Sequence, residues 1–227
     1  MNTRNFESQN ALWSQMQSGE SLNIAAICPG TNALGPGWRA VVWVQGCALR
    51  CRGCIAADWW EFKPANIWNP ESLAKHILVD PTITGLTLSG GEPMQQAAGL
   101  CKLIDAARSI RPINVIAYSG YLLSQLQAPG APEAIQGLIE RLDVLIDSPY
   151  RIQLDDDQGL RGSSNQTIHF LTDTLKDSDF ITGPRRAEIY VQGDSFLVAG
   201  IPSKAITPNV ERAIRGWVTK EVQHERL

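Results

Sequence analysis

The chain has 227 residues, of which 44% are apolar and 19% charged, and its formal net charge is −3. This composition is too apolar for a disordered chain, and no basic stripe points to a nucleic acid as partner. The polar N-terminus predicts no secretory signal, and no apolar run is long enough to predict a membrane span. We therefore expect a cytoplasmic protein whose cysteines stay reduced.

Segments of strand-like composition recur along the chain. They are rich in β-branched residues and lack strict alternation, which is typical of parallel strands buried on both faces. The predicted strands are Leu22–Ile27, Ala40–Gln45, Ile83–Ser89, Ile113–Tyr118, Val144–Asp147 and Thr167–Phe170.

Helical segments lie between these strands. After a short helix around Ala11–Met16, helices are predicted from Pro70 to about Val79, at Met94–Ile110 and at Glu133–Leu142. Asn69 suits the N-cap of the helix that begins at Pro70. The alternation predicts about six βα units, too few for an eight-unit barrel. We expect an α/β fold, a partial (β/α)6 barrel that is open on one side.

Three regions are predicted along the chain: an N-terminal extension at 1–21, the partial barrel at 22–171 and a C-terminal extension at 172–227. In the C-terminal extension, Ala187–Gln192 and Ser195–Ala199 predict a β-hairpin turning at Gly193-Asp194. A helix is predicted at Thr207–Gln223, with Pro208 in its first turn.

Cys47, Cys51 and Cys54 follow the predicted strand Ala40–Gln45 directly. Functional groups of α/β barrels gather at such carboxyl ends of strands. A cluster of four irons normally takes four cysteine ligands, so three cysteines leave one iron open to a group from outside the protein. A reactive iron–sulfur cluster is the leading interpretation.

Cysteines grouped in this way also have other uses in proteins. Structural zinc takes four ligands, usually in two pairs, and no second pair joins Cys51 and Cys54. Cys28 and Cys101 stand alone and are predicted to be buried thiols. A disulfide framework is disfavoured because the cysteine count is odd and no secretory signal is predicted. A zinc site and a redox or structural thiol group remain alternatives.

A second motif, Gly90-Gly91-Glu92-Pro93, follows the predicted strand Ile83–Ser89. Glycines let a ligand approach the backbone closely, and Glu92 could accept hydrogen bonds from an ammonium group. The alternative is a glycine turn before a helix, with Pro93 in the first helical turn. Beside the three-cysteine loop, ligand binding is the favoured interpretation.

The cysteine loop and this glycine motif resemble the radical S-adenosylmethionine (SAM) superfamily. Within it, the chain is similar to the activating enzymes of glycyl radical enzymes, most closely the anaerobic ribonucleotide reductase activases. The shared residues cover about residues 33–171. They are Gly35-Pro36-Gly37, Gly46-Cys47, Gly53-Cys54, Leu88-Ser89-Gly90-Gly91, Gly120-Tyr121-x-Leu-x-x-Leu126, Val144-Leu-Ile-Asp147 and Arg161-Gly-Ser-Ser-Asn-Gln166.

The resemblance implies a [4Fe–4S] cluster held by the three cysteines, with SAM chelating the fourth iron. It implies that Gly90, Gly91 and Glu92 hold the amino end of the SAM methionine. Reductive cleavage of SAM would give a 5′-deoxyadenosyl radical that takes hydrogen from a large protein substrate, with a glycyl radical as the leading product. The electron would come from a donor such as flavodoxin or ferredoxin.

Three further residues are candidates for SAM contacts. Ser119 and Asp147 end neighbouring predicted strands, and either could bond to the SAM ribose or carboxylate, or could instead be a turn or cap residue. Arg161 could pair with the SAM carboxylate or with the backbone of a partner. Trp59 and Trp60 are predicted to pack over the cysteine loop, with a docking surface as the alternative.

The chain departs from the activase pattern in two places. Ser148-Pro149 follows Asp147 where the activases commonly carry glycine, and residues 172–227 extend beyond the pattern. Both departures leave the substrate open. The same chemistry on a peptide, a nucleotide or another protein is one alternative function. A non-catalytic iron–sulfur or zinc interaction module is another.

Overall fold

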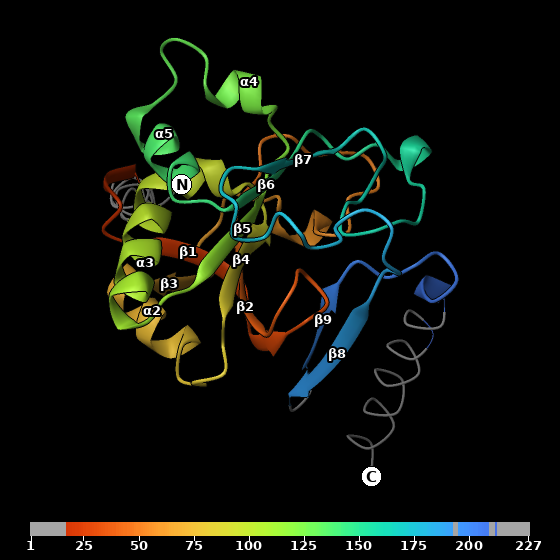
Figure 1. Cartoon of the computed structure of the whole chain (residues 1–227), viewed down its shortest axis with the longest axis horizontal. Coiled ribbons are helices and arrows are strands. Elements are labelled where there is room, and N and C mark those ends of the chain that lie inside the picture. Colours follow the sequence, from red (N-terminus) through yellow and green to blue (C-terminus); the bar gives the residue numbers. More distant parts are fainter. Residues whose placement is uncertain (1–16, 193–194, 209–211, 213–227) are drawn as a thin grey trace, which may run out of the picture.

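A computed structural model describes residues 17–192, 195–208 and 212. Seven strands form one sheet in the order β3-β1-β2-β4-β5-β6-β7, and β8 pairs with β9 in a second, smaller sheet (Figure 1). The strands are β1 (Leu22–Thr31), β2 (Arg39–Val44), β3 (Asn66–Trp68), β4 (Gly85–Gly90), β5 (Asn114–Tyr118), β6 (Val144–Asp147), β7 (Thr167–Phe170), β8 (Ala187–Gln192) and β9 (Ser195–Gly200).

The helices occupy the connections between the strands. The α-helices are α2 (Pro70–Ile77), α3 (Ala97–Ile110), α4 (Leu123–Leu126) and α5 (Glu133–Ile139), and the 3-10 turns are η1 (Ala57–Trp59), η2 (Pro93–Gln96) and η3 (Ile152–Leu154). The predicted cap of α2 is confirmed, because the Asn69 side chain accepts a hydrogen bond from the Ser72 amide at 3.0 Å. The segment predicted as one helix from Met94 begins instead with η2, and α3 follows it.

Some predicted segments lie outside the described residues. These are the helix around Ala11–Met16, the turn at Gly193-Asp194 and most of the helix Thr207–Gln223, of which Thr207, Pro208 and Arg212 are described and helical. Within the described part of the chain, no helix combines the length and the apolar composition that crossing a membrane requires.

The sequence predicts repeated βα units, whose neighbouring strands are parallel. The structure instead has antiparallel pairs on both sides of a group of parallel strands. The strands β2, β4, β5 and β6 are parallel neighbours, whereas β1 pairs antiparallel with β2 and β3, and β7 pairs antiparallel with β6. The segment between β1 and β2 is too short for a parallel crossover, which needs a dozen or more residues. The structure is thus a mixed α/β sheet, and its description as a partial (β/α)6 barrel stays a prediction.

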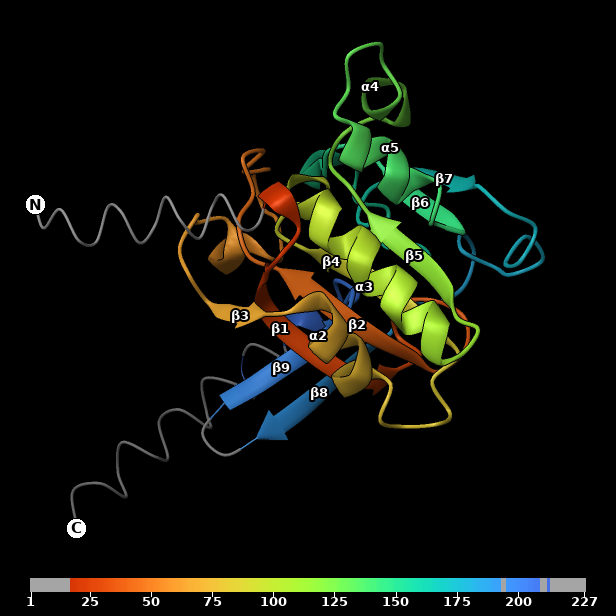
Figure 2. The same cartoon turned by 90° about the vertical axis from the view of Figure 1, so that its left-hand side faces the viewer.

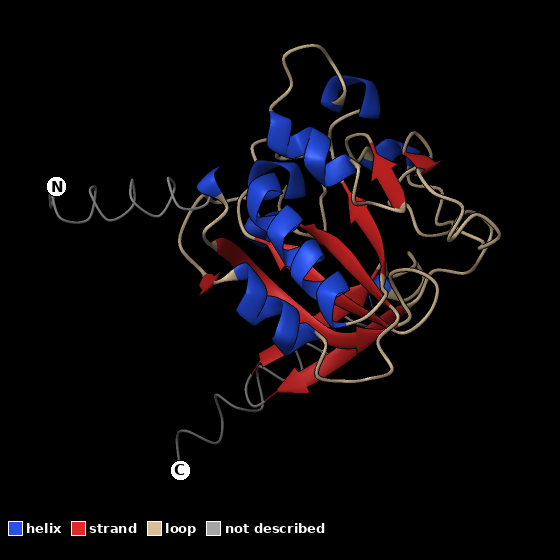
Figure 3. Cartoon of the chain, turned by 60° about the vertical axis from the view of Figure 1, so that its left-hand side comes forward, coloured by secondary structure: helices blue, strands red, loops and turns tan. Residues whose placement is uncertain are grey.

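The helices α2, α3 and α5 pack on one face of this sheet. Figures 2 and 3 show them as a layer against the strands. Leu100, Leu103 and Ile104 of α3 are fully buried and share one hydrophobic cluster with Val42 of β2 and Leu88 of β4. Residues at this helical spacing place one apolar stripe against the sheet.

The C-terminal extension covers the opposite face. Ala199 of β9 clusters with Cys28, Val41 and Trp43, and Phe180 clusters with Ile116. Figure 1 shows β8 and β9 on the side of the sheet away from the helices. Described residues of the C-terminal extension therefore share a core with the strands.

Candidate metal and cofactor site

The three cysteines lie in the loop that leaves the carboxyl end of β2, and both ends of this loop are tied together. The Gly46 amide donates to the Trp59 carbonyl at 2.8 Å, and the Cys47 amide donates to the Trp60 carbonyl at 3.0 Å. Gly46 has a φ of 101°, in the left-handed region where glycine is favoured. We call residues 46–60 the cysteine loop.

Cys47 is buried, Cys51 and Cys54 are partly buried, and all three thiols accept hydrogen bonds. Burial raises the pKa of all three thiols, and neighbouring N–H groups act in the opposite direction by favouring the thiolates. The donors are the amides of Leu49 and Arg50 at Cys47, the amide of Tyr150 at Cys51, and the Ala56 amide and Trp60 side chain at Cys54.

This donor set fits a multinuclear cluster better than a single ion. Among the residues that the structure describes, no three His, Cys, Asp or Glu side chains converge on the position of one metal ion. Structural zinc requires such convergence of four ligands. A four-iron cluster takes its thiolates on separate irons, so three thiols spread along one loop and supplied with N–H donors suit it.

The glycine motif at the end of β4 lies directly against the cysteine loop. The Gly91 amide donates to the Val44 carbonyl at 2.7 Å, and the Glu92 amide donates to the Gly46 carbonyl at 2.9 Å. A Cβ atom on Gly91 would overlap the Gly46 carbonyl, and one on Gly90 would lie 2.6 Å from the Val44 amide nitrogen. The close approach of the two strand ends therefore requires both glycines.

Glu92 joins the ends of β4 and β5. Its side chain is buried; Oε1 accepts from the Met94 amide and the Ser119 hydroxyl, both at 3.0 Å, and Oε2 accepts from the Gly120 amide at 2.8 Å. Burial raises the pKa of Glu92 to about 7, although these three donors favour its charged form. Gly120 in turn packs so closely on Leu49 of the cysteine loop that a Cβ atom would overlap its side chain.

Asp147 is buried, and both of its carboxylate oxygens have hydrogen-bond partners. Its Oδ2 accepts from the Leu123 amide at 2.7 Å and lies 2.9 Å from Nε2 of His169, while Oδ1 accepts from the Ser148 hydroxyl at 3.0 Å. It therefore connects β6, α4 and β7. Ser148 has a φ of 84°, the conformation that a glycine adopts readily. This geometry gives a physical reason for the glycine that the activases commonly carry there.

Arg161 bonds within its own part of the chain. Its Nη2 donates to Asp156 at 2.7 Å, and its Nη1 donates to the Ser164 carbonyl at 3.3 Å. The structure thus brings Gly90, Gly91, Glu92 and Ser119 together beside the cysteine loop, whereas Arg161 contributes to the loop of residues 161–166.

The 161–166 loop holds the segment that follows β6. Asn165 donates to the Pro149 carbonyl at 2.9 Å, Gln166 donates to the Ser148 carbonyl at 3.0 Å, and the Ser163 hydroxyl accepts from the Arg151 amide at 3.1 Å. The Tyr150 amide in this segment donates to the Cys51 thiol. Sequence analysis missed Tyr150, because a backbone amide leaves no signal in residue type.

Trp59 and Trp60 pack as the sequence predicts. Both are partly buried, the Trp59 and Trp43 rings lie 5.8 Å apart, and the Trp60 side chain is hydrogen-bonded to Cys54. They close the cysteine loop and cover one of its thiols.

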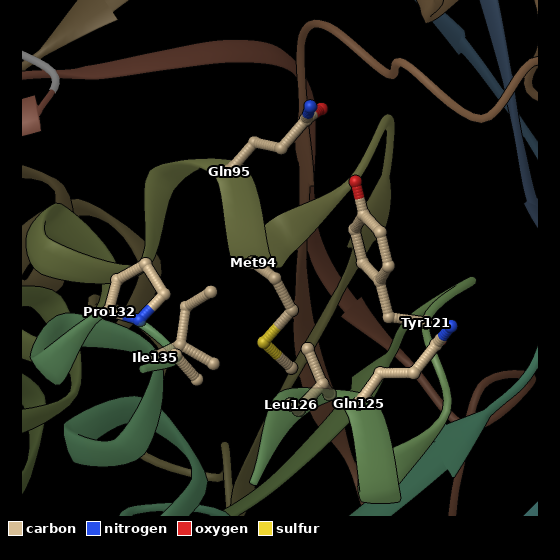
Figure 4. A pocket seen from close by; sticks show the side chains of 8 residues that line it. Met94, Gln95, Tyr121, Gln125, Leu126, Pro132 and Ile135 are labelled. Atoms are coloured by element: carbon tan, nitrogen blue, oxygen red, sulfur yellow. The ribbon is translucent and has the colours of Figure 1, made fainter. Parts of the chain in front are cut away.

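An apolar groove of about 340 Å³ lies beside the site, between η2, α4 and α5. Figure 4 shows Met94, Leu126 and Ile135 around the same space, with Tyr121 at one side. The Met94 amide donates a hydrogen bond to the Glu92 carboxylate, so the groove begins next to the candidate site.

Comparison with known proteins places the chain in an iron–sulfur family. Residues 33–169 match the family model described as a 4Fe-4S single cluster domain, a span that contains the three cysteines, Glu92 and Arg161. Similar proteins include anaerobic ribonucleoside-triphosphate reductase-activating proteins. That of Vibrio cholerae is 35% identical over 147 residues, which are 61% of this chain and 91% of the relative. That of Escherichia coli K12 is 30% identical over 146 residues, 60% and 91% respectively, and that of Enterobacteria phage T4 is 29% identical over 164 residues, 70% and 100%.

Proposed function

Because the chain belongs to the family of 4Fe-4S single cluster domains, and because its relatives are activating proteins, we propose that it is an activating enzyme of the radical SAM type. In this proposal Cys47, Cys51 and Cys54 hold three irons of a [4Fe–4S] cluster and leave the fourth to SAM. When bound, cluster and SAM supply reductive cleavage of the sulfonium and hydrogen abstraction from a partner.

One contact carries the proposal: the hydrogen bond from the Glu92 amide to the Gly46 carbonyl. It joins the glycine motif to the residue before Cys47. A ligand bound to an iron at the cysteine loop would therefore lie within reach of the β4 end. This juxtaposition supports a shared site for a cluster and a small charged cofactor.

The chain's own residues have distinct roles in this proposal. Gly90 and Gly91 bring the backbone of β4 to the loop, and Glu92 faces the ammonium group of SAM. Ser119 fixes the Glu92 carboxylate through its hydroxyl. A cation beside Glu92 would lower the pKa that burial has raised. The present partners of Asp147 and Arg161 favour a positioning role for both rather than direct contact with SAM.

The proposed partner is a large protein. The relatives are named for activating an anaerobic ribonucleoside-triphosphate reductase, and we propose that this chain installs a glycyl radical on an enzyme of that kind. A flavodoxin or ferredoxin would supply the electron, and the cytoplasm would keep such a cluster reduced. Radical SAM chemistry on a different substrate is a second candidate, favoured by the C-terminal extension, which lies beyond the family match.

The test of the chemistry is anaerobic reconstitution with iron and sulfide, followed by reductant and SAM. We expect Cys51→Ala to lower the yield of 5′-deoxyadenosine at least tenfold, because one cluster ligand is lost. Cys101→Ala is the matched control: this thiol lies in α3, contacts the Ala134 carbonyl at 3.6 Å, and its loss should leave the yield unchanged. Equal yields from wild type and Cys51→Ala would refute the proposed chemistry.

The test of the partner is electron paramagnetic resonance of the reduced enzyme mixed with SAM and an anaerobic ribonucleotide reductase. A glycyl radical signal on the reductase supports the leading candidate. A wild-type chain that makes 5′-deoxyadenosine yet gives no such signal with any glycyl radical enzyme encoded beside it would favour the second candidate.

A further inference from the structure

The C-terminal extension contacts the segment of residues 155–162 through the buried side chain of Arg185, which is 1% exposed. Its Nη1 lies 2.9 Å from Asp155 and 3.3 Å from Asp157, and its Nη2 donates to the carbonyls of Arg161 and Gly162 at 2.8 and 3.1 Å. A guanidinium can make these bonds at once because its donors form a fixed planar fork.

A second residue of the extension reinforces the same attachment. The Lys204 ammonium group donates to the Asp155 carbonyl at 2.6 Å, and the Lys204 amide donates to Asp157 at 3.0 Å. Residues 155–166 contain neither helix nor strand. Because such a segment lacks a regular hydrogen-bond ladder, its order depends on contacts of this kind.

The segment that Arg185 holds contacts the cysteine loop through Tyr150. Gly162 lies so close to the Tyr150 ring that a Cβ atom would be 2.9 Å from its Cδ2. The Tyr150 hydroxyl donates to Asp155 at 3.3 Å, and the Tyr150 amide donates to the Cys51 thiol. Three successive contacts thus connect Arg185 to a candidate cluster ligand: from Arg185 to Asp155 or Gly162, from there to Tyr150, and from Tyr150 to Cys51.

From these contacts we propose that Arg185 is a positioning residue of the cluster and SAM site, and that the extension is part of the functional unit. The family match ends at residue 169, so Arg185 lies outside it. The inference rests on the proposed function, because it assigns Arg185 a role in the site that binds the cluster and SAM.

The test compares Arg185→Met with Arg186→Met in the full-length chain, reconstituted anaerobically. Arg186 is the neighbouring arginine and is exposed, so it controls for the loss of one positive charge. We expect Arg185→Met to raise the KM for SAM at least tenfold and to change the electron paramagnetic resonance spectrum of the reduced cluster. Arg186→Met should stay within twofold of wild type in KM and keep its spectrum.

A readout without cofactor is hydrogen exchange of peptides that span residues 148–166. Arg185→Met should speed exchange there at least tenfold and leave the peptides of α3 as in wild type. If that variant does not fold, Arg185→Lys replaces it, because lysine keeps the charge but not the fork. We expect Arg185→Lys to raise the KM for SAM and to speed exchange relative to wild type, each by less than the tenfold expected of Arg185→Met.

The outcomes separate this inference from the proposed function. An active wild type whose folded Arg185 variants match Arg186→Met in KM, spectrum and exchange would overturn the role of Arg185 alone. A reconstituted wild type that forms no 5′-deoxyadenosine would overturn both the proposed function and the inference that rests on it.

Discussion

Glu92 is a titratable group buried where two strand ends meet. Its pKa of about 7 in the folded chain lies above its ordinary value of 4.5, with burial as the main cause. Since the folded state binds this proton more tightly than the unfolded state, the associated stability is fully present below about pH 4.5. It is lost as the pH rises through about 7.

Glu92→Gln should flatten the dependence of the free energy of unfolding on pH. Wild type is expected to lose up to about 3 kcal/mol through this group between acid and neutral pH, and the variant should not show that loss. The check is the free energy of unfolding from urea titrations at several pH values between 4.5 and 8. Glu140→Gln, at an exposed position, should keep the wild-type slope. An unchanged slope in Glu92→Gln would show that another group titrates.

Gly91 and Gly130 separate two reasons for which a chain needs glycine. A Cβ atom on Gly91 would overlap the Gly46 carbonyl, whereas Gly130 has a φ of 88° and nothing within 4 Å. Gly130→Ala should therefore destabilise by about 1 kcal/mol, through backbone strain alone. Gly91→Ala should cost about 3 kcal/mol or more, because backbone must move. Chemical denaturation measures the free energy of unfolding of both variants. An equal loss of stability in the two would contradict the packing argument.

At the scale of elements, the hairpin of β8 and β9 is attached to β1 by polar contacts. The Tyr190 hydroxyl lies 2.6 Å from the Gly30 carbonyl and 2.5 Å from Glu188, and Thr31 donates to Glu188 at 2.7 Å. Burial raises the pKa of Tyr190, so the phenol stays protonated and able to donate. The hairpin thereby gains a fixed position on the sheet.

Tyr190→Phe removes the hydroxyl from this contact. We expect a loss of about 1–2 kcal/mol, because the Gly30 carbonyl loses a buried donor. Guanidinium denaturation measures it. Val191→Thr, at a side chain 60% exposed on the same strand, should change stability by no more than about 0.5 kcal/mol. If both variants unfold like wild type, the contact does not hold the hairpin.

The positions of the longer elements follow from sequence pattern, whereas strand direction and the shortest elements do not. The predicted strands Val144–Asp147 and Thr167–Phe170 have the same bounds in the structure, as β6 and β7. The helix α4 and the strand β3 are too short for a period to be detected, and they were not predicted. Buried parallel and antiparallel strands can carry the same residues. Only the tertiary structure therefore shows that β1 pairs antiparallel with β2 and β3, and that β7 pairs antiparallel with β6.

At the scale of the whole molecule, the sheet has two covered faces, and the second depends on the C-terminal extension. Phe180 and Leu175 complete the cluster of Ile116, Val144 and Ile146. Without the extension these side chains would face water. Burial of apolar surface of this kind stabilises by about 25 cal/mol per Å².

A chain that ends at residue 171 should therefore bind a hydrophobic dye and unfold at lower denaturant than wild type. A chain that ends at residue 208 keeps the described hairpin and is the control; its dye binding should equal that of wild type. Dye fluorescence and urea midpoints provide the measurement. If the 171-residue chain behaves like wild type in both, the extension is not part of the core.

The sequence by itself determined the cysteine spacing, the glycine motif and the placement of both at strand ends, because ligand spacing and strand periodicity are local properties. The tertiary structure decided which groups these residues bond to. Glu92 meets Ser119 and Gly120, Asp147 meets His169, and Arg185 meets Asp155 and Gly162 only when distant segments pack together. The bonds of a buried polar group depend on what surrounds it in three dimensions, and no local pattern contains that information.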